Sequence, residues 1–358
     1  MARIDSFLRL VLEQQASDLY MLSGSPPMIR YNGDLIPIKF RTITPPEARK
    51  FLFEILTADQ QKKFEETRDM DFSYEITGHG RFRANFFMDS KGIGGIFRII
   101  PARVKTMDEL DLPGALRKFA YLDNGLVLVT GPSGCGKTTT LAAIIRELNH
   151  RRKKHIITIE DPIEYIHSND NSLISQREVG AHTPTFHAAL RSALRESPDV
   201  ILVGELRDIE TISLALTCAE TGTLIFGTLH TQSCSKTVDR IVDVFPKDAQ
   251  EQVRTQLSIT LRGVVAQQLV KTSDRSGRVA ALEILIGSTA LGNLIREGKT
   301  YQINTLMQAQ ESEKTGMQTM DQALARFVRE GRILLDDALQ HAYDRSLFNQ
   351  FKDSANRG

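Results

Sequence analysis

One short stretch constrains the fold of this 358-residue chain more than any other. The aliphatic run LVLVT at 126–130 leads directly into GPSGCGKT at 131–138. The run predicts a buried strand, and the glycines let the following turn bend until its backbone amides point inward at the start of a helix. Such a turn binds phosphate groups. We therefore expect a nucleotide-binding loop formed by Gly131, Ser133, Gly134, Cys135, Gly136, Lys137, Thr138 and Thr139.

Two side chains of this loop have chemistry of their own. Lys137 is expected to reach the β and γ phosphates, and Thr138 to place its hydroxyl on Mg²⁺. Cys135 contributes only its backbone amide. The chain has no NKxD tetrapeptide to read guanine, which favours ATP as the nucleotide.

Three further aliphatic runs resemble the first in length and composition. They are HIITIE at 155–160, VILVGE at 200–205 and LIFGTLH at 224–230. Short aliphatic runs separated by helical stretches are typical of a parallel sheet buried on both faces, whose strands end at one common edge. The sequence thus predicts an α/β domain with Glu160, Glu205 and His230 near the phosphate loop.

These strand-end residues allow more than one role each. Glu205 can serve as the general base for an attacking water, or it can be an exposed carboxylate paired with Arg207. Glu160 and Asp161 can bind Mg²⁺ through water, or they can cap the next turn before Pro162. His230 is a hydrogen-bonded structural histidine or a group that senses the terminal phosphate. The predicted metal site comprises Thr138, Glu160 and Glu205.

The pattern of the remaining residues predicts a smaller domain before this core and a helical region after it. Residues 4–12 have helical spacing, Asn32-Gly33 predicts a hairpin turn, and Thr44 and Thr57 begin capping boxes. In RFRANFFM at 81–88, the polar residues alternate with apolar ones, as in a strand with one buried face. The predicted divisions are an α+β domain at 1–101, a linker at 102–118, the ATPase core at 119–287 and a helical region at 288–358.

Composition narrows the classes of protein to which this chain can belong. Lys and Arg number 45 against 44 Asp and Glu, so no global positive field attracts nucleic acid, and only RRKK at 151–154 suggests a translocase. No stretch approaches the roughly 18 apolar residues of a membrane span. Cys135, Cys218 and Cys234 lack CxxC spacing, which argues against a zinc site. We expect a cytoplasmic protein that does not bind nucleic acid.

Taken in order, the motifs resemble those of the secretion ATPase superfamily, and within it the PilT-type retraction ATPases of type IV pili. ASDLYMLSGSPPMIRYNGDL resembles the N-terminal PAS-like domain, GPSGCGKTTT the Walker A motif, and TIEDPIEY the Asp box. LRESPDVILVGELRD resembles the Walker B motif and ETGTLIFGTLHT the His box. Two positions depart from the family pattern: Tyr20 stands where histidine is common, and Leu291-Gly292 replace Ile-Arg in ALGNLIREGK.

The resemblance implies a RecA-like ATPase core and a homohexameric ring that hydrolyses ATP with Mg²⁺. It implies that the N-terminal domain of one subunit closes over the nucleotide of its neighbour and supplies Arg83 and Arg98. In the absence of the resemblance, these two arginines would be interpreted as members of surface ion pairs. It favours His230 as a nucleotide sensor. It also implies that the protein drives retraction of the pilus rather than extension. The expected location is the cytoplasmic side of the inner membrane, at the base of the pilus. Expected partners are an inner-membrane platform protein and a paralogous retraction ATPase, to which this chain could itself be a regulatory companion.

Overall fold

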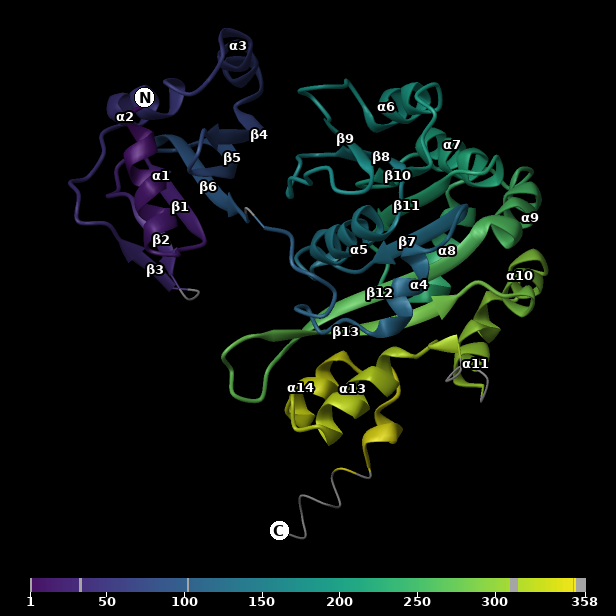
Figure 1. Ribbon diagram of the computed structural model, residues 1–358. Helices are drawn as coiled ribbons and strands as arrows, with labels where there is room; N and C mark the ends of the chain where they lie inside the picture. Colours follow the sequence, from purple (N-terminus) through teal and green to yellow (C-terminus); the bar gives the residue numbers. More distant parts are fainter. Residues whose placement is uncertain (1, 32–33, 102, 310–314, 350, 352–358) are drawn as a thin grey trace. The chain divides into compact units, whose positions relative to one another are not determined.

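The computed structural model describes residues 2–31, 34–101, 103–309, 315–349 and 351. The chain divides into two compact units (Figure 1). The first comprises Met1–Arg103 together with Pro162–Ile166, and the second comprises Val104–Asp161 and His167–Gly358. Each unit has its own sheet and its own hydrophobic core.

The first unit is built on a six-stranded antiparallel sheet in the order β3-β2-β1-β6-β5-β4. Three helices accompany it: α1 (Ile4–Glu13), α2 (Pro45–Phe53) and α3 (Ala58–Thr67). The strands are β1 (Asp18–Leu22), β2 (Met28–Tyr31), β3 (Asp34–Pro37), β4 (Asp69–Ile76), β5 (Gly80–Asp89) and β6 (Gly92–Ile100). The predicted α+β architecture of this region is confirmed.

Local sequence signals explain these elements. Thr44 and Thr57 each form the predicted capping box, with Glu47 and Gln60 respectively. Along β5 the buried positions are Phe82, Ala84 and Phe86, as the alternation predicts. Strands β2 and β3 pair antiparallel, whereas the predicted turn residues Asn32 and Gly33 lie outside the described residues.

The second unit contains a seven-stranded sheet in the order β13-β12-β7-β11-β10-β8-β9. The four predicted aliphatic runs form β7 (Gly125–Thr130), β8 (His155–Glu160), β10 (Val200–Val203) and β11 (Leu224–Leu229). These strands and β9 (Leu173–Glu178) and β12 (Leu261–Lys271) are parallel, and β13 (Arg278–Ile286) is antiparallel to β12. Every residue of β7, β10 and β11 is buried, which confirms a sheet covered on both faces.

Alternate residues of β7 enter two different cores. Val127 and Val129 pack with α4 (Arg117–Ala120), which follows η1 (Gly114–Leu116), and with α5 (Lys137–Arg151). Leu126 and Leu128 pack in the core on the other face, with helices that lie apart from α5 in Figure 1. These helices are α6 (Phe186–Ala193), α7 (Ile209–Glu220), α8 (Cys234–Asp243), α9 (Gln250–Thr260), α10 (Thr289–Arg296) and α11 (Ile303–Gln308).

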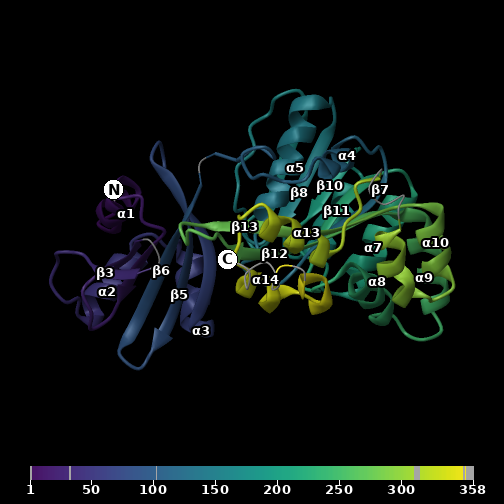
Figure 2. The same cartoon turned by 90° about the horizontal axis from the view of Figure 1, so that it is seen from below.

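Helices follow β13 through the rest of the described chain, as predicted. After α10 come η2 (Thr300–Gln302), α11, α13 (Met320–Arg329), α14 (Leu335–His341) and η3 (Arg345–Phe348). Helices α13 and α14 lie beside β13 and β12 (Figure 2) and bury a separate apolar cluster with Val270 and Ala281. The departure at Gly292 has a packing explanation: a Cβ there would lie 2.8 Å from the carbonyl oxygen of Ser258, so glycine allows α10 to approach α9.

Candidate nucleotide-binding and catalytic site

The parallel register brings the predicted residues to one edge of the second unit's sheet. Leu229 pairs with Thr130, and Val203 pairs with both Gly227 and Ile159. The strands therefore end side by side, and their next residues project from the same edge. The structure thus groups Gly131, Glu160, Glu205 and His230 as the strand pattern predicts.

The loop after β7 has the backbone of a phosphate cradle. Gly131, Gly134 and Gly136 all have positive φ angles, of 141°, 77° and 90°. A Cβ at Gly131 would lie 2.3 Å from the carbonyl oxygen of Gln267, so no larger residue fits there. Ser133 is exposed, and Thr138 and Thr139 lie partly buried in the first turn of α5. The amides and the helix start can therefore receive phosphate oxygens.

Lys137 is held within the same loop. Its ammonium group donates hydrogen bonds to the carbonyl oxygens of Gly131 at 2.8 Å and Pro132 at 3.1 Å. These neutral acceptors leave the positive charge of Lys137 uncompensated by any carboxylate at those contacts. An anion entering the loop would meet that charge directly.

A residue that the sequence analysis missed fixes the shape of this loop. Gln267, on β12, is 2% exposed and links the end of the turn to the first turn of α5. Its amide nitrogen donates to the carbonyl oxygen of Cys135 at 2.6 Å, and its amide oxygen accepts from the hydroxyl of Thr140 at 2.7 Å. A glutamine inside the apolar run VVAQQLV was the available signal, because a buried amide needs partners.

Cys135 itself is buried, and burial raises the pKa of its thiol. The thiol therefore stays protonated at neutral pH and is a poor nucleophile or metal ligand. Its backbone carbonyl, by contrast, is the acceptor for Gln267. The geometry agrees with a structural role for this residue inside the loop.

Glu205 lies at the centre of a charged cluster after β10. Its carboxylate is 2.7 Å from Nη2 of Arg207 and 3.2 Å from Nε2 of His230, and its side chain is 18% exposed. Burial acts to raise the pKa of Glu205, but the hydrogen bond and charge of Arg207, with a contribution from His230, outweigh it and lower the pKa. The pairing with Arg207 that the sequence analysis considered is therefore present, on a carboxylate that is mostly buried at the end of the strand.

Glu160 has a different environment at the end of β8. It is 6% exposed and accepts hydrogen bonds from the hydroxyl of Thr158 at 2.7 Å and the amide of Gln176 at 3.2 Å. The neighbouring Asp161 is exposed and helps to raise the pKa of Arg207. A carboxylate held by neutral donors can still bind a metal through water.

His230 is exposed at the end of β11, and its ring approaches Glu205 rather than the core. The next residue, Thr231, contacts the hydroxyl of Thr237 at 2.7 Å, and that hydroxyl lies 3.4 Å from the hydroxyl of Thr130. Since Thr130 directly precedes the phosphate loop, the His230 segment contacts the carboxylate of Glu205 directly and is connected to the base of the loop through Thr237. The ring is not packed as a core histidine.

The two arginines of the first unit form a pair across neighbouring strands. Arg83 on β5 stands directly opposite Arg98 on β6, and Arg98 stands opposite Asp18 on β1. Arg98 lies 2.8 Å from the carboxylate of Asp18, and this hydrogen bond raises the pKa of Arg98. Arg83 lies 3.5 Å from both Asp71 and Glu164. The repulsion expected of facing like charges is thus offset by carboxylates.

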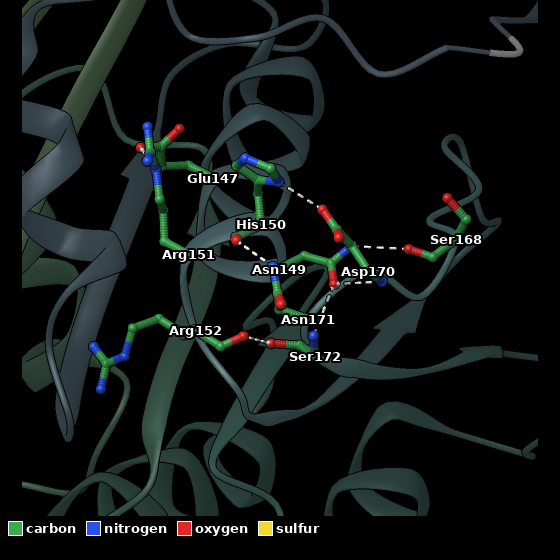
Figure 3. A network of polar contacts seen from close by, with 9 residues as sticks. All are labelled: Glu147, Asn149, His150, Arg151, Arg152, Ser168, Asp170, Asn171 and Ser172. Carbon is green, nitrogen blue, oxygen red and sulfur yellow. Dashed lines mark hydrogen bonds and ion pairs between the residues drawn. The ribbon is translucent and has the colours of Figure 1, made fainter.

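The basic run at 151–154 is largely neutralised. Arg151 contacts Glu147 at 3.4 Å, Arg152 contacts Asp123 at 2.5 Å, and Lys154 contacts Asp199 at 3.0 Å. Figure 3 shows Arg151 and Arg152 at the end of α5, where the side chain of Asn149 bonds the segment at 168–172. His150 contacts Asp170 at 2.6 Å in the same network. The run serves to anchor the helix end and leaves little charge for nucleic-acid phosphates.

The described residues contain no cluster of three or more His, Cys, Asp or Glu side chains placed to hold a metal ion. Mg²⁺ bound with a nucleotide needs few protein ligands, because phosphate oxygens and water supply most of its coordination. One hydroxyl, from Thr138, and the carboxylates of Glu160 and Glu205 fit that pattern. Across the same described ranges, no helix has the length and apolarity needed to span a membrane.

Comparisons with known proteins agree with this geometry. A family model described as type II/IV secretion system protein matches residues 105–345. The chain is 48% identical over 339 residues to the type IV pilus retraction ATPase PilT of Pseudomonas aeruginosa, covering 95% of this chain and 98% of that protein. It is 40% identical over 338 residues to the type IV pilus ATPase PilU of the same organism, covering 94% and 88%.

Solved structures extend the likeness to three dimensions. The crystal structure of the pilus retraction motor PilT with bound ADP matches with a TM-score of 0.89 at 43% identity, covering 97% of this chain and 98% of that one. The ATPase DotB of Legionella pneumophila matches with a TM-score of 0.82 at 28% identity, covering 94% of each chain. Both of these matches include the first unit as well as the second.

Proposed function

The chain belongs to the type II/IV secretion system protein family, and we propose that it is an ATP-hydrolysing motor that drives retraction of type IV pili. The observation that carries the proposal is the grouping of the phosphate loop, Glu160, Glu205 and His230 at one sheet edge. This grouping occurs in a chain that is 48% identical to a pilus retraction ATPase over 95% of its length.

In the proposed reaction, the loop amides and Lys137 bind the phosphates. Mg²⁺, when bound there, would neutralise charge on the phosphates. The residues that would hold it are Thr138 directly and Glu160 and Glu205 through water. Glu205 remains ionised because Arg207 and His230 lower its pKa, and it orients and deprotonates the attacking water.

His230 would report whether the γ phosphate is present. Its Nε2 atom contacts Glu205, and a terminal phosphate offers an alternative acceptor at the same edge. Exchange between the two acceptors would move the segment that follows β11. Thr231 and Thr237 would carry this movement to the base of the phosphate loop, through the hydroxyl of Thr130.

We propose that the motor works as a homohexameric ring in which Arg83 and Arg98 reach the nucleotide held by a neighbouring subunit. A guanidinium group stabilises charge that develops on the transferred phosphoryl group. Both arginines would have to exchange their present carboxylate partners for phosphate oxygens. Mixing subunits that carry Arg98→Ala with subunits that carry Lys137→Ala tests the arrangement, because sites completed across an interface regain turnover in mixed rings.

The proposed setting is the cytoplasmic face of the inner membrane at the pilus base, where the ring would contact a platform protein. A strain that lacks the gene should lose retraction and accumulate surface pili. The wild-type gene should restore retraction, and a Glu205→Gln gene should not. Normal retraction in the deletion strain, or restoration by Glu205→Gln, would overturn the proposed function.

A second candidate is a companion ATPase that binds nucleotide but depends on a paralogous motor for retraction. The observation that favours it is the 40% identity to PilU over 94% of this chain. Purified protein that hydrolyses ATP slowly alone, and faster with its paralogue, would support this candidate. A nucleic-acid translocase requires stimulation by DNA at low salt, which the paired basic run at 151–154 gives little reason to expect.

A further inference from the structure

The loop between β11 and α8, residues 230–233, touches the catalytic groups on one side and the C-terminal helices on the other. Toward the site, His230 contacts Glu205 at 3.2 Å, and Thr231 connects through Thr237 to Thr130. The loop therefore adjoins both the carboxylate and the start of the phosphate loop. Its position decides where the ring of His230 lies.

On its other side the loop is held by a residue more than 100 positions away. The hydroxyl of Tyr343 donates a hydrogen bond to the carbonyl oxygen of Gln232 at 2.7 Å, with a sequence separation of 111 residues. Glu283, on β13, accepts a hydrogen bond from the backbone amide of Cys234 at 2.7 Å. Both ends of the turn into α8 are thus fixed by elements that follow β12.

Tyr343 is itself held in place. The two carboxylate oxygens of Asp321 accept hydrogen bonds from the amides of Tyr343 at 2.8 Å and Asp344 at 3.1 Å. Asp321 is 7% exposed and lies in the first turn of α13, which the capping box of Thr319 and Gln322 begins. Tyr343, the donor to Gln232, is therefore hydrogen-bonded through its backbone to a helix that packs on the central sheet.

The electrostatic surroundings keep the tyrosine in its donor form. Tyr343 is half exposed, and the partial burial of its ring, with an added contribution from Glu283, raises the pKa of Tyr343 to about 12. Glu283 is 2% exposed, and burial raises its pKa as well. Around neutral pH the Tyr343 hydroxyl thus retains the proton that it donates to the loop.

We propose that Tyr343 is a positioning residue for ATP hydrolysis: its hydroxyl holds residues 230–233 so that His230 meets Glu205. The C-terminal helices thereby set the geometry of the nucleotide site, and a movement of the loop upon hydrolysis is transmitted to them. The contact between Tyr343 and the loop rests on the hydrogen bonds described above. Its effect on ATP turnover rests on the proposed function.

The substitution Tyr343→Phe tests the inference because it removes only the hydroxyl. Tyr121→Phe is the matched control, since Tyr121 is 51% exposed and Tyr343 is 50% exposed. For the full-length protein, we expect Tyr343→Phe to raise the rate of amide hydrogen exchange within residues 231–236. We expect turnover at saturating ATP to fall on the order of threefold to tenfold, the effect of losing one such hydrogen bond. Thermal stability and KM for ATP should change little, and the control should resemble the wild type.

A double-mutant cycle with His230→Ala separates a positioning role from general structural damage. If Tyr343 acts through His230, adding Tyr343→Phe to His230→Ala should lower turnover no further. Additive losses, or unchanged loop exchange and turnover in Tyr343→Phe alone, would overturn the inference. Wild-type turnover in His230→Ala would also overturn the inference, because Tyr343 could then not affect turnover through His230, whereas the proposed motor function would still stand on the Glu205→Gln result.

Discussion

The ends of β8 and β10 present two carboxylates in equivalent topological positions but in different chemical surroundings. Glu160 is almost fully buried and accepts hydrogen bonds from the neutral groups of Thr158 and Gln176. Glu205 is more exposed and contacts the guanidinium of Arg207 and the imidazole of His230. Strand position alone therefore does not assign chemistry to an acid at this edge.

The difference separates a fixed group from one that can exchange partners. The side chains of Arg207 and His230 are 66% and 47% exposed, so either can turn toward an incoming phosphate. Thr158 is fully buried on β8 and Gln176 is half-buried on β9, so both are less exposed than Arg207. We therefore expect Glu205 to act on water, and Glu160 to hold the metal through water.

The largest effect is expected from Glu205→Gln, which keeps the shape of the side chain but removes the base. Turnover should fall by about 100-fold or more, the usual contribution of a general base, while nucleotide affinity changes little. Phosphate release and binding of a fluorescent ATP analogue measure the two properties. The matched control is Glu251→Gln, an exposed position on α9. Turnover near the wild-type value in Glu205→Gln would reverse the assignment of the two acids.

Glu160→Gln should have a smaller effect with a different signature. Loss of a group that holds a metal through water typically costs about 10-fold to 100-fold. We expect the Mg²⁺ concentration needed for half-maximal turnover to rise, and added Mg²⁺ to restore part of the activity. A titration with Mg²⁺ compares this variant with Glu205→Gln, whose turnover added Mg²⁺ should not restore because the general base itself is missing. An unchanged Mg²⁺ requirement in Glu160→Gln would argue against a metal role.

Arg207→Gln tests the cationic surroundings of Glu205 through the pH dependence of turnover. Arg207 lowers the pKa of Glu205, so its removal should raise that pKa. Because the base must be ionised, the loss of activity on acidification should then begin at a higher pH than in the wild type. The exposed Arg195→Gln is the control, and its acid limb should coincide with that of the wild type. A shift of the Arg207→Gln limb toward lower pH would contradict the expectation that Arg207 lowers the pKa of Glu205.

The sequence predicts much of this edge because its signals are local. Each aliphatic run forms a strand, and parallel strands must end together, so the grouping of Gly131, Glu160, Glu205 and His230 follows from pattern and topology. The positive φ angles of the loop glycines are equally local. The two capping boxes of the first unit follow from four-residue motifs.

The features that the sequence does not reveal depend on strand register or on side-chain contacts between distant segments. The alignment of Arg83 with Arg98 follows from pairing of β5 with β6, and a shift of one residue would place them on opposite faces. Gln267 reaches Cys135 across 132 positions, and Tyr343 reaches Gln232 across 111. Such contacts have no periodicity or motif of their own, so only the folded structure identifies them.

The smallest effect is expected from Thr158→Val, which removes one neutral donor to Glu160 and nearly preserves the volume of the side chain. Gln176 remains to orient the carboxylate, so turnover should fall only about twofold to fivefold, consistent with the loss of a single hydrogen bond. The control is Thr217→Val on α7, whose hydroxyl donates to the carbonyl oxygen of Ser213 away from the sheet edge. The Mg²⁺ requirement should rise in Thr158→Val and stay constant in the control. If Thr158→Val instead moved the acid limb of the pH profile as Arg207→Gln does, Glu160 would be the titrating base, and the contrast between the two strand ends would be lost.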